Sequence, residues 1–127
     1  MKRKHDPFKD CWAFPGGFVD YGENPEKSVL RELEEETNLK GTLKRLVGVY
    51  GEGNWDPWKH VVTIVYEINV SNFNEMKALD DAKEVNLFDL EKIKNQSSLF
   101  AFDHYIILTD WISKFAHSNL DPTMDTK

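Results

Sequence analysis

The sequence has little of what secreted, membrane-spanning or nucleic-acid-coating proteins need. Cys11 is the single cysteine among 127 residues, which excludes an internal disulfide framework and leads us to expect a cytoplasmic protein. No apolar run approaches the roughly 20 residues that cross a bilayer, and the basic N-terminus lacks the apolar stretch of a secretory signal. Only 16 bases accompany 22 acids, and the formal charge of −6 argues against a nucleic-acid partner.

The length suits one domain, which we expect to span residues 1–127 with a frayed polar tail from about residue 117. Turn residues and apolar periodicity predict helices over 25–37, 90–93 and 103–115, and strands over 43–50, 60–70 and 85–88. Strands and helices that mix without strict alternation favour an α/β or α+β sandwich.

Three of these segments have patterns that predict which residues are buried. Asn24 is a suitable N-cap and Pro25 a suitable first residue for the helix over 25–37, which Asn38 can end in the left-handed conformation. The apolar positions of this helix are Val29, Leu30 and Leu33. Along the strand over 60–70, apolar side chains share one face at Val62, Ile64, Tyr66, Ile68 and Val70. In the last helix the apolar positions are Ile106, Ile107, Trp111 and Phe115.

Three carboxylates gather on one face of the helix over 25–37. Glu32, Glu35 and Glu36 stand at i, i+3 and i+4, where like charges repel one another. A solvated helix face is one interpretation of such a cluster. A hard divalent cation among the carboxylates is the other, and the glycine turn shortly before the helix favours it. A backbone carbonyl at Gly16 or Gly17 can approach the same cation, because no side chain blocks it.

The segment 17–39 resembles the signature of the Nudix hydrolases, G-x5-E-x7-R-E-U-x-E-E-x-G-U, in which U is a bulky aliphatic residue. The positions that match are Gly17, Glu23, Arg31, Glu32, Leu33, Glu35, Glu36 and Leu39. Asn38 replaces the last glycine, a change that the left-handed conformation tolerates. The resemblance implies a Nudix-type α/β/α sandwich with a mixed sheet.

The resemblance also implies a metal site and a reaction. Glu32, Glu35, Glu36 and the Gly16 carbonyl would bind Mg²⁺, or Mn²⁺ in its place, and Arg31 would orient the glutamates. Glu23 would be a structural partner of Arg31. Family members hydrolyse a nucleoside diphosphate linked to another group: water attacks one phosphorus while the metal absorbs developing charge.

A carboxylate base completes that chemistry, and the resemblance leaves its position open. In some members the base lies on the helix of the signature, where Glu35 and Glu32 are candidates. In others it lies on a loop in the second half of the domain, which here is the acidic segment 80–84. Within that segment Glu84 is our first candidate and Asp81 the second, although the segment also reads as a solvated loop.

Four stretches outside the signature resemble the ADP-ribose pyrophosphatase branch of the family: residues 3–19, 46–50, 56–62 and 99–104. ADP-ribose needs an apolar slot for adenine and donors for two phosphates. The side chains that suit these needs are Arg3, Trp12, Phe14, Phe18, Trp58 and His60. Each also has a purely structural interpretation: the aromatic residues can belong to the core, and Arg3 can be part of a basic terminus that binds nothing. The pair Asp103–His104 is either a helix cap or a substrate contact.

Sixteen residues precede Gly17, fewer than in most members, so the usual first strand is expected to be missing or replaced. A missing strand would expose a sheet edge on which a homodimer can form. The first functional hypothesis is hydrolysis of ADP-ribose to AMP and ribose 5-phosphate. The second is hydrolysis of another substrate, such as a nucleoside diphosphate sugar, a dinucleotide polyphosphate or an oxidised nucleotide. A non-catalytic ADP-ribose sensor is disfavoured, because all three glutamates are kept and the chain is acidic.

Overall fold

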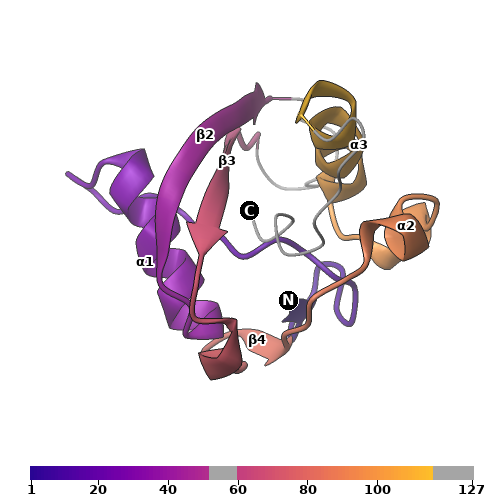
Figure 1. Cartoon of the computed structure of the whole chain (residues 1–127). Coiled ribbons are helices and arrows are strands. Elements are labelled where there is room, and N and C mark those ends of the chain that lie inside the picture. Colours follow the sequence, from indigo (N-terminus) through magenta and orange to yellow (C-terminus); the bar gives the residue numbers. More distant parts are fainter. Residues whose placement is uncertain (52–59, 116–127) are drawn as a thin grey trace.

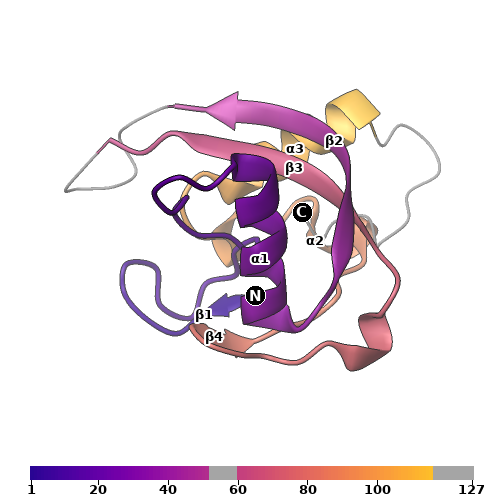
Figure 2. The ribbon, with the colours of Figure 1, turned by 90° about the vertical axis from the view of Figure 1, so that its left-hand side faces the viewer.

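A twisted antiparallel hairpin forms the middle layer of the molecule. It consists of β2 (Gly41–Tyr50) and β3 (Thr63–Val70) in the computed structural model, which describes residues 1–51 and 60–115. Helix α1 (Pro25–Thr37) lies on one side of the hairpin and α3 (His104–Phe115) on the other (Figure 1). Figure 2 shows the molecule from the α1 side, with α1 in front and the two strands curving past its upper end. The predicted α+β class is therefore confirmed.

A second antiparallel pair joins the N-terminus to the middle of the chain. Strand β1 (Lys2–Arg3) pairs with β4 (Ala82–Glu84), and α2 (Leu90–Ile93) follows after an irregular segment. The described strands thus form two small sheets, with an isolated parallel bridge between Trp12 and Phe100 nearby. The prediction of a strand over residues 85–88 was wrong. The strand is β4, at residues 82–84, because that is where β1 pairs. Residues 85–88 have no regular secondary structure.

Helix α1 has the boundaries that its sequence predicts. The Asn24 side chain accepts a hydrogen bond of 2.8 Å from the Glu26 N–H, and Pro25 occupies the first turn. Asn38 ends the helix with φ at 63°, in the left-handed conformation. Within residues 1–51 and 60–115, no helix has the length and hydrophobicity that crossing a membrane requires.

Apolar cores lie on both faces of the hairpin. Between α1 and the hairpin, the buried side chains are Val29, Leu33, Leu39 and Ile68. Between α3 and the hairpin, they are Val47, Val65, Leu90, Ile93, Ile107, Leu108 and Trp111. The hairpin contributes buried side chains to both cores: Ile68 to the α1 side, and Val47 and Val65 to the α3 side.

Two details of the predicted apolar faces were wrong. Ile106 is 56% exposed, whereas Leu108 is fully buried, because the stripe of α3 that meets the hairpin follows Ile107, Leu108 and Trp111. In the segment predicted as a strand over 60–70, Ile68 is buried, but Val62, just before β3, and Ile64 are exposed. These two residues lie toward the outer end of the hairpin, next to an open cavity described below.

Glu67 is a charged residue in the α3-side core, and its side chain is only 2% exposed. The Trp111 indole N–H donates to Glu67 Oε1 over 2.8 Å, and Arg45 Nε lies 3.2 Å from the same oxygen. Lys44 Nζ lies 3.2 Å from Glu67 Oε2. A register shift between Leu43 and Arg45 explains why two consecutive β2 residues reach one carboxylate. Buried charges require such partners.

We therefore expect Glu67→Ala to lower the free energy of unfolding by about 2–4 kcal/mol, because it leaves the Trp111 N–H unpaired in the core and removes both ion pairs. Glu67→Gln keeps an acceptor for Trp111 and should cost less. Urea denaturation measures both values, with the exposed Glu34→Ala as the control. Equal stability of wild type and Glu67→Ala would contradict this role.

Candidate active site

The glycine turn at residues 15–17 lies against two carboxylates of α1. The Gly16 N–H donates to Glu36 Oε1 over 2.8 Å, and Glu36 is buried. At Gly17, an added Cβ would stand 2.6 Å from the Glu32 carboxyl carbon. A side chain cannot fit there without moving the Glu32 carboxylate. The turn and the helix are thus packed so closely that the backbone of one meets the carboxylates of the other.

Arg31 holds the remaining charges of the site in place. Its Nε and one terminal nitrogen form a two-point contact with Glu23 at 2.8 and 2.9 Å. The other terminal nitrogen donates to Glu32 Oε1 at 2.9 Å and to Glu35 Oε1 at 2.8 Å. Asp20 adds a weaker contact at 3.4 Å. One guanidinium therefore offsets the repulsion among several carboxylates.

These contacts change the ionisation of the groups involved. Hydrogen bonds from Arg31 lower the pKa of Glu23 to about 2. Those same bonds, above all the bond to Glu23, raise the pKa of Arg31. Partial burial raises the pKa of Glu32, and Arg31 only partly compensates. A cation near Glu32 would favour its charged form.

The donor set fits a hard divalent cation. Glu32, Glu35 and Glu36 offer only oxygen, and the backbone of Gly16 is held directly beside Glu36. Glu35 is the most solvent-exposed of the three, with a side chain that is 44% exposed against 15% for Glu32. Within the described ranges, no three acidic, histidine or cysteine side chains are already gathered as a metal-binding group. Arg31 instead lies among the carboxylates.

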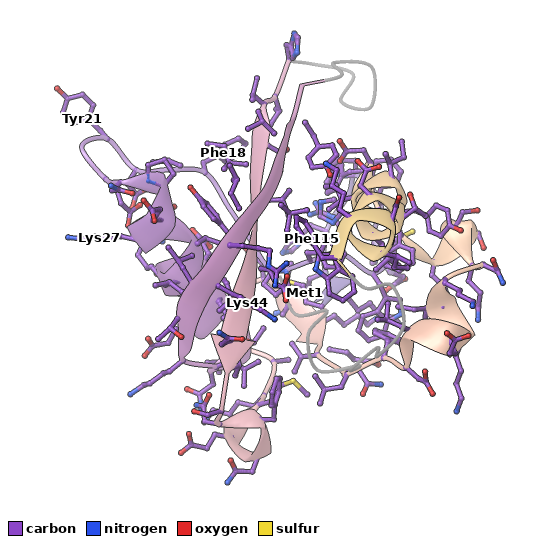
Figure 3. All side chains as sticks on the ribbon, turned by 45° about the horizontal axis from the view of Figure 1, so that its top comes forward. Met1, Phe18, Tyr21, Lys27, Lys44 and Phe115 are labelled. Carbon is purple, nitrogen blue, oxygen red and sulfur yellow. The ribbon has the colours of Figure 1, made fainter. Side chains whose placement is uncertain are left out.

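A cavity of about 270 Å³ opens beside the glycine turn. Gly16, Gly17, Phe18 and Val19 form one wall, and residues 61–64 of the β3 side form another. The third wall contains Arg3, Phe14, Phe102 and His104. Figure 3 shows Phe18 between the start of α1 and the hairpin, while Tyr21 points away from the molecule. The cavity therefore has apolar walls, the Arg3 guanidinium at one side and the glycine turn at its edge.

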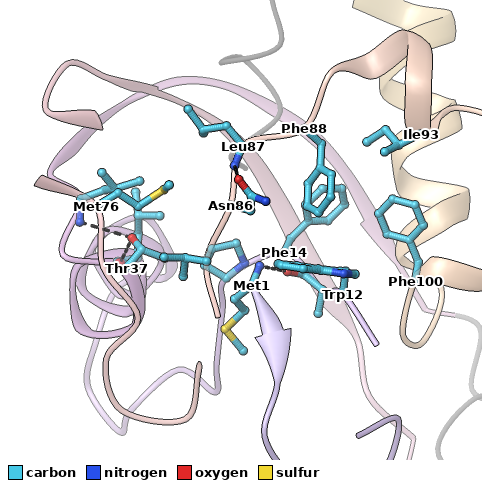
Figure 4. Close-up of a pocket in the computed structure, with 15 residues that line it drawn as sticks. Met1, Trp12, Phe14, Thr37, Met76, Asn86, Leu87, Phe88, Ile93 and Phe100 are labelled. Atoms are coloured by element: carbon cyan, nitrogen blue, oxygen red, sulfur yellow. Dashed lines mark hydrogen bonds between the residues drawn. The ribbon is translucent and has the colours of Figure 1, made fainter. Parts of the chain in front are cut away.

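The structure brings only some of the predicted substrate residues to this cavity. Arg3, Phe14 and Phe18 line it. Trp12 instead packs edge-to-face on Phe88, with ring centroids 4.7 Å apart. It lines a second, smaller cavity of about 50 Å³ (Figure 4). His60 is exposed and contacts the Gly51 carbonyl, and Trp58 lies outside the described residues.

The acidic segment 80–84 is divided between a turn and β4. Glu84 lies on β4, where its carboxylate faces the Lys2 ammonium at 3.9 Å. Asp81 lies in the preceding turn, 3.8 Å from His5. Both lie against side chains of the N-terminal segment, while Glu32, Glu35 and Glu36 lie on α1. The role of Glu84 or Asp81 as a base stays a prediction.

Sequence reasoning missed Phe102, and it left Asp103–His104 open between a helix cap and a substrate contact; His104 lines the third wall of the cavity. The Arg3 guanidinium stacks on the Phe102 ring, with 4.6 Å to its centroid. His104 Nδ1 accepts a hydrogen bond from the Phe14 N–H over 3.0 Å. The unusual pair Asp103–His104 ahead of an apolar helix was the available signal. It identified the position but not the direction in which the imidazole faces.

Comparison with known proteins identifies the family of the chain. The family model for the NUDIX domain matches residues 1–110. The chain belongs to the NUDIX family. This NUDIX chain is 46% identical over 112 residues to an ADP-ribose pyrophosphatase of Methanocaldococcus jannaschii. That alignment covers 88% of the chain and 63% of the relative, so the chain spans less than two thirds of the relative's length.

Solved structures of NUDIX proteins have the same fold. A MutT NUDIX hydrolase from Burkholderia pseudomallei superposes with a TM-score of 0.71 at 28% identity, covering 87% of this chain and 84% of that one. A bifunctional NMN adenylyltransferase/ADP ribose pyrophosphatase from Francisella tularensis, solved with AMP and an Mn ion, gives 0.64 at 28% identity. That match covers 88% of this chain and 36% of the other.

The contact between Gly17 and Glu32 predicts a loss of metal binding with little loss of stability. We expect Gly17→Ala to weaken Mg²⁺ binding by about 10-fold or more, because the new Cβ displaces the Glu32 carboxylate. The free energy of unfolding should change by less than about 1 kcal/mol, since a flexible side-chain end gives way. Isothermal titration calorimetry measures the affinity. Gly51→Ala is the matched control, because its Cβ would meet only a Val62 methyl group at 3.9 Å. Unchanged Mg²⁺ affinity in Gly17→Ala would refute Glu32 as a metal ligand.

The Glu23–Arg31 contact predicts a dependence of stability on acid. Folding lowers the pKa of Glu23 from its ordinary 4.5 to about 2. The stabilisation is therefore complete above pH 4.5 and disappears as the pH falls toward 2. We expect the stability difference between wild type and Glu23→Gln to be constant at neutral pH and to shrink over this window, as followed by urea denaturation at stepped pH. A difference that stays the same down to pH 2 would show that Glu23 is not the titrating group.

Proposed function

We propose that this chain is a Mg²⁺-dependent pyrophosphohydrolase that cleaves ADP-ribose to AMP and ribose 5-phosphate. The observation that carries the proposal is the packing of Glu32 and Glu36 against the glycine turn at the edge of a cavity. Membership of the NUDIX family and the similarity to an ADP-ribose pyrophosphatase support it. A cluster of carboxylates beside a cavity is the arrangement that metal-assisted hydrolysis of a nucleotide pyrophosphate requires.

The cavity supports a nucleotide substrate through the chemistry of its walls. Its volume of about 270 Å³ lies close to the lower end of the about 300–1,000 Å³ that ligand sites occupy. Phe18 and the apolar side chains of β3 suit an adenine ring, which stacks on flat apolar groups. The Arg3 guanidinium suits a phosphate, and its stacking on Phe102 fixes its direction. Glutamates on the other side of the glycine turn then lie next to the pyrophosphate.

In this proposal, different residues bind the metal, orient the carboxylates and accept the proton. Glu32, Glu36, Glu35 and the Gly16 carbonyl would hold the cation, which supplies Lewis-acid activation of the pyrophosphate when bound. Arg31 keeps Glu32 and Glu35 oriented before substrate arrives. Glu35 is exposed and adjacent to both, so it is placed to accept the proton of the attacking water. Glu84 is the second candidate for this base.

Further parts of the proposal concern the surroundings of the enzyme. Mn²⁺ is an alternative to Mg²⁺, and the Francisella tularensis neighbour was solved with an Mn ion. The lone Cys11, free in the structure, fits a cytoplasmic location. A homodimer is the assembly that we propose for the chain, on the sequence argument of an exposed sheet edge.

We expect the purified chain to convert ADP-ribose to AMP in millimolar Mg²⁺, and chelation with EDTA to abolish the reaction. Glu35→Gln should lower kcat by roughly 10³-fold, because it removes both a metal ligand and a candidate base. Chromatographic detection of AMP measures both rates. Glu34→Gln is the matched control, since Glu34 is the neighbouring, exposed glutamate of the same helix.

The outcomes separate the hypotheses. Turnover of another nucleoside diphosphate derivative but not of ADP-ribose would leave the family chemistry and replace the substrate. Binding of ADP-ribose without turnover of any substrate would favour a sensor. A Glu35→Gln variant with wild-type kcat would refute the role of Glu35. If Glu84→Gln lowers kcat and leaves metal affinity unchanged, the base lies on β4 instead.

A further inference from the structure

The segment that carries the glycine turn is held by hydrogen bonds at every backbone N–H from residue 12 to 16. The Trp12 N–H donates to the Leu99 carbonyl and the Ala13 N–H to the Met1 carbonyl. The Gly16 N–H donates to Glu36, and Pro15 has no N–H. The remaining donor is Phe14, whose partner is neither backbone nor carboxylate but the imidazole of His104.

His104 meets Phe14 through two contacts. Its Nδ1 accepts the Phe14 N–H over 3.0 Å, so this nitrogen carries no proton and the neutral ring is protonated at Nε2. The imidazole also stacks on the Phe14 ring, with centroids 5.3 Å apart and an interplanar angle of 18°. A single side chain at the start of α3 therefore fixes both the backbone and the side chain of Phe14, two residues before Gly16.

The backbone ahead of His104 is unusual in a way that serves this contact. Phe102 adopts φ at 54°, a conformation that is strained for a bulky side chain. Its ring is held by the Arg3 guanidinium and by an edge-to-face contact with Phe8, whose centroid is 5.0 Å away. The chain turns at Phe102 from the extended residues beside Trp12 into α3. This turn delivers His104 to Phe14 at the first position of the helix.

We propose that His104 is a positioning residue for the metal site. It acts through Phe14 and holds the Gly16 carbonyl in register with the α1 carboxylates. The Glu36–Gly16 hydrogen bond connects the turn only to a side chain that is itself a proposed metal ligand. A second contact is therefore needed to fix the turn independently of the metal. The His104–Phe14 contact ties the same turn to α3, on the opposite side of the hairpin. This inference rests on the proposed metal-dependent hydrolysis, but not on the identity of its substrate.

Two substitutions separate the hydrogen bond from the ring. His104→Phe keeps an aromatic ring to stack on Phe14 and removes the acceptor. His104→Asn places Oδ1 where Nδ1 stands and keeps an acceptor. We expect His104→Phe to weaken Mn²⁺ binding by about 10–100-fold and to lower kcat, with the KM for ADP-ribose at saturating metal changed far less. His104→Asn should restore most of the Mn²⁺ affinity.

The measurements need no substrate except for the kinetic constants. Electron paramagnetic resonance of free Mn²⁺ gives the metal affinity. Amide hydrogen exchange by NMR on the metal-free protein reports the Phe14 N–H, which should exchange faster in His104→Phe and not in His104→Asn. Tyr105→Phe is the matched control, because it removes another hydrogen bond from the first turn of α3, to the Lys94 carbonyl, without touching the glycine turn.

Each outcome decides the matter. Unchanged Phe14 exchange in His104→Phe would show that the hydrogen bond does not hold the turn. Faster exchange with wild-type Mn²⁺ affinity would reduce His104 to a purely structural role and overturn the proposal. A wild-type chain that binds no Mn²⁺ would overturn the metal site together with it. Expected Mn²⁺ and exchange results in a chain that does not hydrolyse ADP-ribose would leave His104 in its role and refute the proposed substrate alone.

Discussion

Crowding of negative charge on α1 and on the segment just before it is the constraint around which the site is built. Between residues 20 and 36 the chain carries seven acids and two bases, a formal −5 out of −6 for the whole chain. An isolated helix of this composition would be weakened by repulsion among its glutamates. Arg31 offsets that repulsion by contacting Glu23, Glu32 and Glu35 at once. The Gly16 N–H does the same for Glu36, so part of the compensation comes from outside the helix.

That external contribution links the chemistry of the site to the layers of the fold. Glu36 is buried because Leu33 and Val29, on the adjacent face of α1, pack on the hairpin and draw the helix inward. A buried carboxylate needs a donor, and the glycine turn supplies one. The segment that carries the glycine turn is itself hydrogen-bonded to His104 of α3, and α3 packs on the opposite face of the same hairpin. The two helices never need to touch for one to affect the other's carboxylates.

The parts of the molecule that local chemistry governs were predictable. Asn24, Pro25 and Asn38 fix the ends of α1 through their own backbone preferences, and the carboxylate spacing places three glutamates on one helix face. The parts that depend on distant partners were not. β4 lies at residues 82–84 because β1 pairs there, and Leu108 replaces Ile106 in the core because of how α3 meets β3. The local sequence also does not show that Glu67 is buried, because its partner Trp111 lies on α3.

The same distinction explains why the predicted substrate residues were harder to place than the proposed metal ligands. The proposed ligands share one helix and one turn, so their mutual positions follow largely from helix geometry. The cavity combines the N-terminal segment, the glycine turn, the outer half of β3 and the start of α3. Trp12 and Phe14 are two residues apart in the sequence. Of the two, only Phe14 lines the large cavity, because the Trp12 ring packs against Phe88. Bulk and aromaticity alone could not separate the two. What separates them is their partners from distant segments: His104 of α3 stacks on Phe14, whereas Phe88 meets the Trp12 ring edge to face.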